Sequence, residues 1–149
     1  MRRFIFLVAV AAVLAPTASA SAATNSYVTK VRVGHHASFD RIVITFHGPV
    51  PKHAVRYVKT VRQDGSGKEI HLLGKAKLLI TVHPTLATKS QPQGTVTPRF
   101  PEIRQVKGAG NYEGYTSYGV GLAAHEPFDV STLGSPSRLV IDIQLPAGR

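Results

Sequence analysis

The sequence contains no cysteine and no tryptophan, and only one methionine. Without cysteine the chain has no disulfide, no thiol nucleophile, no zinc–thiolate site and no lipid-modified cysteine. Acidic residues are also scarce: eight Asp and Glu stand against 18 Lys and Arg, which gives a formal net charge of +10. Isolated carboxylates disfavour glycosidase-type catalysis, which needs two facing carboxyl groups about 5–10 Å apart, and calcium loops, which need denser oxygen ligands. The positive excess favours anionic polymers or surfaces as partners.

Long apolar runs are absent except near the start. Residues 4–14 are all apolar, follow Arg2 and Arg3, and precede the small-residue sequence Ala18-Ser19-Ala20. This order is typical of a signal peptide over residues 1–20, cleaved near Ala20. The run is too short for a bilayer core, which takes roughly 20 apolar residues, although a retained N-terminal anchor is the alternative. We therefore expect a secreted, extracytoplasmic chain of the bacterial envelope, with no membrane span after cleavage and no nucleic-acid partner.

Apolar and polar residues alternate with a period of two from Tyr27 onward, and no segment shows a convincing helical period. The pattern is clearest in 41–47, 77–83 and 138–144, where every second residue is Ile, Leu, Val or Phe. Turn residues separate these segments from further candidates. The expected strands are 28–33, 41–47, 55–62, 69–72, 77–83, 103–107, 112–122, 128–133 and 138–144. Eight or nine short strands of this kind predict an all-β fold, a single antiparallel β-sandwich over residues 27–146.

Three connections stand out between the expected strands. Residues 63–67 (QDGSG) supply the positive φ angles that a hairpin turn requires. Residues 108–111 (GAGN) are expected to bend the chain before a tyrosine-rich strand. Residues 84–101 contain four prolines and few apolar residues, so we expect a long irregular loop there, either a functional cover or a tolerated insertion.

No catalytic or metal-binding motif is complete. Ser66 lies in a turn and lacks the Gly-x-Ser-x-Gly frame before a helix, and residues 64–68 do not form a phosphate-binding loop. The seven histidines show no His-x-x-x-Asp, His-x-His or His-Glu-x-x-His spacing, so only convergence in space would make a zinc site. We expect no enzyme activity, no metal and no cofactor.

A binding surface is the remaining possibility. Arg32, Arg41 and Arg56 are expected to point outward from neighbouring strands, with Tyr57 close by. Arginine forks match the geometry of carboxylates, and aromatic rings stack on apolar faces. These three arginines and Tyr57 are therefore candidate ligand-binding residues.

Tyr115 is a fifth candidate. On an extended strand it shares a face with Gly119 and Gly121, and two glycines leave a shallow trough that backbone or ligand can enter. The competing interpretation is that the other face is core and the glycines mark a bulge or close sheet packing.

The two ends of the expected domain resemble the AMIN family, the non-catalytic domain of exported bacterial amidases and outer-membrane secretins. The similarity lies in 31–34 (VRVG), 39–44 (FDRIVI) and the closing 135–143 (SPSRLVIDI). The AMIN-like variant of small secreted or lipid-anchored bacterial proteins is more similar still. Its counterparts are 56–58 (RYV), 64–67 (DGSG), 112–114 (YEG) and 119–122 (GVGL).

This resemblance implies a compact β-sandwich that binds or localises to peptidoglycan and catalyses nothing itself. Together with export and charge, it predicts a non-catalytic binding module of the cell envelope that recognises peptidoglycan or another anionic wall polymer. The alternative is a structural or interaction protein that docks an envelope protein partner through a strand edge or the long loop.

Overall fold

The structure is a computed structural model that describes residues 26–86 and 94–147. The expected signal peptide, residues 1–20, lies outside the described residues, as does part of the expected loop 84–101. The described chain forms strands and no helix, so it offers no helical segment long and apolar enough to span a membrane. The strands are β1 (Tyr27–His35), β2 (Phe39–His47), β3 (Lys52–Tyr57), β4 (Val61–Arg62), β5 (Glu69–Ile70), β6 (Ala76–His83), β7 (Thr95–Val96), β8 (Ile103–Tyr112), β9 (Tyr115–Leu122), β10 (Phe128–Leu133) and β11 (Arg138–Gln144).

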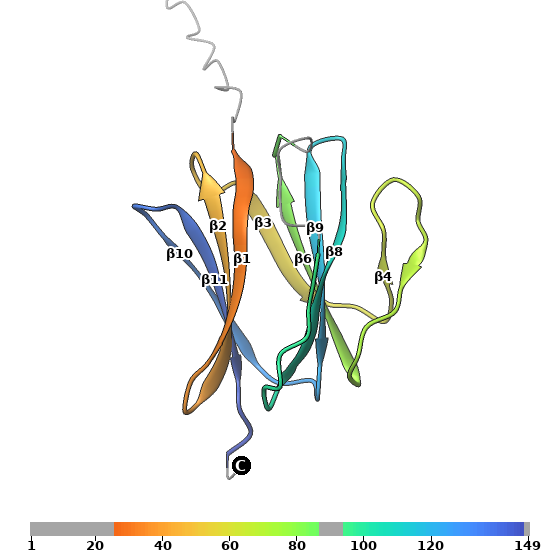
Figure 1. Ribbon diagram of the computed structural model, residues 1–149, viewed down its shortest axis with the longest axis vertical. Helices are drawn as coiled ribbons and strands as arrows, with labels where there is room; N and C mark the ends of the chain where they lie inside the picture. The colour runs from red at the N-terminus through yellow and green to blue at the C-terminus, as the bar shows by residue number, and fades with distance from the viewer. Residues whose placement is uncertain (1–25, 87–93, 148–149) are drawn as a thin grey trace, which may run out of the picture.

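The strands form two facing antiparallel sheets (Figure 1). The first sheet has the order β1-β2-β11-β10, and the second has the order β3-β6-β9-β8-β7. A separate two-stranded ribbon, β4-β5, stands on the far side of the second sheet in Figure 1. The prediction of an all-β antiparallel sandwich is confirmed.

The core lies between the sheets and is built from alternate residues, as the period of two predicted. The three clearest predicted strands became β2, β6 and β11, which occupy central positions in their sheets. Their inward side chains are fully buried: Ile42, Ile44, Leu78, Ile80, Leu139, Ile141 and Ile143. Val120, Leu122 and Tyr118 from β9 complete the opposite wall.

A buried acidic side chain, Asp40, links the two sheets. Asp40 is fully buried, and its Oδ2 accepts hydrogen bonds from the backbone amides of Glu102 and Ile103, at 2.8 and 3.0 Å. Its Oδ1 lies 2.7 Å from Nδ1 of His35. Because Asp40 belongs to the first sheet and Ile103 begins β8 of the second, this carboxylate fixes one sheet against the other.

Three strand predictions need correction. The expected strand 55–62 is two strands, because pairing with β6 ends near Tyr57 and the chain then leaves the second sheet to form β4. The expected strand 112–122 is interrupted at Glu113 and Gly114, whose φ angles of 48° and 79° form the turn between β8 and β9. The expected bend at 108–111 is a bulged part of β8.

The loop prediction also needs correction within its described part. Thr95 and Val96 form β7 and pair with Lys107 and Val106 of β8. A two-residue edge strand is too short to produce a visible alternation, so the sequence pattern could not indicate it. The turn predicted at 63–67 is present and joins β4 to β5.

Candidate ligand-binding surface

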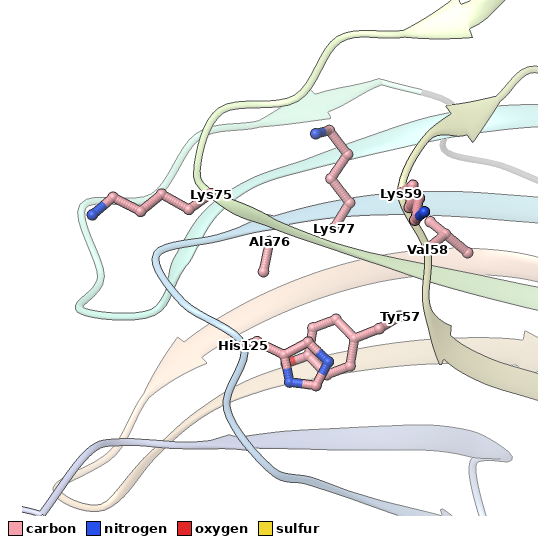
Figure 2. Close-up of a pocket in the computed structure, with 7 residues that line it drawn as sticks. All are labelled: Tyr57, Val58, Lys59, Lys75, Ala76, Lys77 and His125. Atoms are coloured by element: carbon pink, nitrogen blue, oxygen red, sulfur yellow. The ribbon is translucent and has the colours of Figure 1, made fainter.

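A shallow depression opens where β3 ends and β6 begins (Figure 2). Its volume is about 400 Å³, and it is lined by Tyr57, Val58, Lys59, Lys75, Ala76, Lys77 and His125. The amide of Val58 donates a hydrogen bond to the carbonyl of Lys77, which holds the two strands together at this point. The depression thus combines side chains from three separate segments of the chain.

Two aromatic rings form one wall of the depression. The Tyr57 and His125 rings are stacked, with centroids 3.6 Å apart and planes inclined by 23°, and Phe128 meets Tyr57 edge-on. The Tyr57 hydroxyl donates a 2.6 Å hydrogen bond to the carbonyl of Glu126. Burial raises the pKa of Tyr57, so the phenol stays neutral and keeps this bond at physiological pH. The ring is therefore fixed, while His125 is exposed to solvent.

Three lysines line the same depression. In Figure 2 the ammonium groups of Lys59, Lys75 and Lys77 stand apart around the depression and do not converge on one point. In residues 26–86 and 94–147, no carboxylate lies within 4.0 Å of any of these ammonium groups. Separated, unneutralised cations suit an extended ligand with several negative groups better than a single small anion.

Two further depressions adjoin the first and extend its positive charge. One, of about 620 Å³, shares Tyr57 and Lys59. The other, of about 570 Å³, shares Lys75. We call the cations that line the three depressions the basic strip: Arg56, Lys59, Arg62, Lys75, Lys77, Arg99 and Arg104.

One acidic residue borders the basic strip. Asp64 lines the second depression and is half-buried. Burial raises the pKa of its carboxyl, while a hydrogen bond with Ser117 partly offsets this effect. Among the described residues that line the three depressions, Asp64 is the one with an acidic side chain.

Two of the five predicted ligand-binding residues belong to this region. Arg56 and Tyr57 line the same depression, although adjacent residues of β3 point to opposite faces of the sheet. Tyr57 packs against the core and does not point outward beside Arg56. The expected proximity of Tyr57 to Arg56 is thus met, while a role of these two residues in binding stays a prediction.

Arg41 and Arg32 lie elsewhere, on the outer face of the first sheet. The Nε and Nη2 atoms of Arg41 each donate a 2.7 Å hydrogen bond to Asp142, which raises the pKa of Arg41. The guanidinium also lies 4.9 Å from the centre of the Phe39 ring. Arg32 lines a separate groove of about 400 Å³ with Thr29, Lys30, Val43, Thr45, Pro136 and Arg138.

Tyr115 lies at the opposite end of β6 from the basic strip. Its exposed ring stacks on His83 with centroids 4.0 Å apart. The trough beside it is filled by the chain itself, because Val61 and Leu72 contact the position of Gly119, and the carbonyl of Leu73 covers Gly121. The interpretation of close packing at these glycines is therefore confirmed, and the trough offers no space to a ligand.

The histidines and the turn serine have local partners. His35 is held by Asp40, and the Ser66 hydroxyl donates to Oε1 of Gln63 within the β4-β5 turn. Within the part of the chain that the structure describes, no three His, Asp or Glu side chains gather closely enough to hold a metal ion.

Sequence reasoning missed Lys59, Lys75, Lys77 and His125. Lys59 and Lys75 lie in the two connections between the second sheet and the β4-β5 ribbon, Lys77 lies at the start of β6, and His125 lies in the β9-β10 connection. No local pattern joins residues so far apart in the chain. The alternation Lys75-Ala76-Lys77 was the only available signal, and it predicts two lysines on one side of a strand.

Comparison with known proteins gives one match. A family model described as the AMIN-like domain matches residues 26–145, which is nearly all of the described chain. No curated protein and no solved structure matches. AMIN-like domains are modules of the extracytoplasmic, cell-envelope type. With a two-sheet β-sandwich and a match of this extent, the chain belongs to the AMIN-like domain family.

Proposed function

We propose that the basic strip binds peptidoglycan or another anionic polymer of the cell wall, and that the domain acts as a secreted binding module without catalytic activity. The observation that carries this proposal is the set of three lysines around the Tyr57–His125 stack, none of which is neutralised by a carboxylate of the described chain. Membership of a cell-envelope family supports the choice of ligand.

The chemistry of the strip suits such a polymer. Ammonium and guanidinium groups attract the carboxylates of peptide stems, and several separated cations match charges spaced along a chain. The exposed His125 ring, stacked on Tyr57, offers a flat aromatic face to a sugar. Export through a signal peptide at residues 1–20 would place the domain beside this ligand.

Retention on purified sacculi tests the proposal with the full chain. The strip variant carries Lys59→Gln, Lys75→Gln and Lys77→Gln. If each ammonium contributes about 0.5–1 kcal/mol, as exposed ion pairs do, affinity falls by roughly tenfold or more. Retention of the unmodified chain should decline as salt rises from about 50 to 500 mM, because exposed charges are screened. Absence of retention even at low salt would refute the proposal.

A matched control separates a site from a general charge effect. The groove on the first sheet also contains three cations, so Lys30→Gln, Arg32→Gln and Arg138→Gln together remove the same charge. We expect this control variant to be retained nearly as well as the unmodified chain. Equal losses in both variants would show that net charge, and not the basic strip, governs binding.

The identity of the anion is tested with two preparations of sacculi. One retains covalently attached phosphate polymers and the other has had them removed. Capture of peptide-stem carboxylates predicts similar retention on both, whereas a phosphate-rich ligand predicts retention on the first preparation alone.

A further inference from the structure

The two sheets have four edge strands, which differ in how they are protected from pairing with other chains. β1 has a bulge at Val28/Lys30 and carries the exposed cations Lys30 and Arg32. β3 carries exposed Lys52 and Arg56, and β7 is only two residues long. Charges, bulges and shortness are the usual protections of an edge. Three of the four edges therefore discourage further pairing.

β10 is the least protected of the four edges. Five of its six residues are exposed, it contains no Lys, Arg or Pro, and its register with β11 is continuous. Val130 and Leu133 are 38% and 45% exposed. Its one charged residue, Asp129, accepts a 2.8 Å hydrogen bond from Nε2 of Gln144. In Figure 1 the hairpin of β10 and β11 diverges from the second sheet. Residues of β10 beyond Phe128 are exposed on both faces of the strand.

The hydrogen bonds identify which residues of β10 can pair outward. The amide of Gln144 donates to the carbonyl of Pro127, and alternation along an antiparallel ladder then directs the backbone groups of Asp129, Ser131 and Leu133 toward β11. The amides and carbonyls of the intervening residues, Phe128, Val130 and Thr132, consequently point to the open edge.

We propose that β10 pairs in antiparallel fashion with β10 of a second copy of this chain, so that Val130 lies opposite the partner's Val130. A two-fold axis at Val130 places outward-directed amides opposite each other. An axis at Ser131 would instead place opposite each other backbone amides and carbonyls that already hydrogen-bond to β11. In the register centred on Val130, Phe128 faces the partner's Thr132 and Asp129 faces the partner's Ser131, so no like charges are opposed.

Charge selects a second copy at this edge and not at the others. A chain of net charge +10 repels its own copies, and β1 or β3 would bring lysines and arginines together. Among the edges longer than two residues, β10 is the one where two copies approach without opposing cations. Interfaces smaller than about 1,200 Å² are generally weak, so a six-residue contact predicts a dimer that forms only as concentration rises. This inference is independent of the proposed wall binding.

Cysteine cross-linking tests the register, because the natural chain has no cysteine. Facing residues of a hydrogen-bonded pair have Cα atoms about 5.5 Å apart, within disulfide range. The full chain with Val130→Cys should therefore form a disulfide dimer when oxidised with diamide. Thr132→Cys is the matched control, since the two copies of residue 132 would lie four positions apart, about 13 Å. Equal cross-linking of both variants would overturn the register.

Sedimentation velocity over a range of concentrations tests the dimer itself. Val130→Lys places two ammonium groups opposite each other and should abolish dimer formation. Val96→Lys on β7 is the control, because Val96 is equally exposed at 38% and the charge change is identical. A monomeric natural chain at every concentration, or a dimer that persists in Val130→Lys, would overturn the proposal. Equal loss of the dimer in both variants would also overturn it. The same holds if the chain stays monomeric and β10 pairs with an extended segment of a different protein.

Discussion

The outer faces of the two sheets differ in whether the chain covers them. On the first sheet, the outward residues of β2 from Phe39 to Thr45 are half-buried and those of β10 are exposed. On the second sheet, every residue of β9 from Thr116 to Leu122 is buried, because the segment 58–75, which we call the arm, lies across its outer face. The open face presents its charges directly. On the covered face, the arm occupies the surface of the sheet, so the charged side chains lie at the border of the arm. The basic strip lies at this border.

Substitution of Gly121 tests this difference with the largest expected loss of stability. A Cβ at this position would overlap the carbonyl oxygen of Leu73, a backbone atom that moves only if the arm moves. Gly121→Ala should therefore lower the free energy of unfolding by about 3 kcal/mol or more, at the upper end of overpacking effects. Urea denaturation measures the loss, and limited proteolysis within the arm shows whether it has lifted from the sheet.

The matched control is Gly34→Ala on the open face. Gly34 follows Arg32 on the outward side of β1, and an added Cβ would meet only a His36 side-chain atom at 3.8 Å. The expected change is within about 0.5 kcal/mol, as for ordinary surface substitutions. A comparable loss in both variants would mean that β-strand glycines matter here for reasons other than the arm.

Gln105 gives the second test, through a polar contact beneath the arm. Its Oε1 accepts a 3.2 Å hydrogen bond from the amide of Leu73, and its side chain is nearly buried. Gln105→Leu removes the acceptor of this hydrogen bond, which should cost about 0.5–1.5 kcal/mol. Hydrogen exchange at Leu73 should accelerate in the same variant. Thr97→Val removes only a long 3.4 Å contact to Gln105 and should change stability little.

The difference between the open and the covered face also explains which parts of the fold the sequence could predict. Alternation predicted β2, β6 and β11 and their buried residues, because each of these strands hides one face against a single core. It could not predict the arm, since Val61, Leu72 and Leu73 contact β9 residues about 50 positions away and leave no periodic signal near themselves. Gly119 and Gly121, the two outward glycines of β9, were the one feature of the sequence that indicated this contact.

The site was predictable to a smaller extent. Arg56 and Tyr57 are adjacent in the chain, so their common location followed from the sequence. The ion pair of Arg41 joins residues 101 positions apart, and the lysines meet His125 only because the sandwich closes. Long-range contacts of this kind decide which cations are neutralised, and no local pattern records them.

Asp142 provides the smallest and last test, on the open face. Arg41 and Asp142 are 35% and 20% exposed, so Asp142→Asn should cost no more than about 1 kcal/mol of stability. The substitution also frees the Arg41 guanidinium that the sequence had indicated as a ligand-binding group. Asp129→Asn on β10 makes the same change in net charge without releasing an arginine, because Asp129 is bonded to Gln144. Binding through the basic strip predicts equal retention of the two variants on sacculi. Stronger retention of Asp142→Asn alone would instead locate wall binding on the open face, beside Arg41.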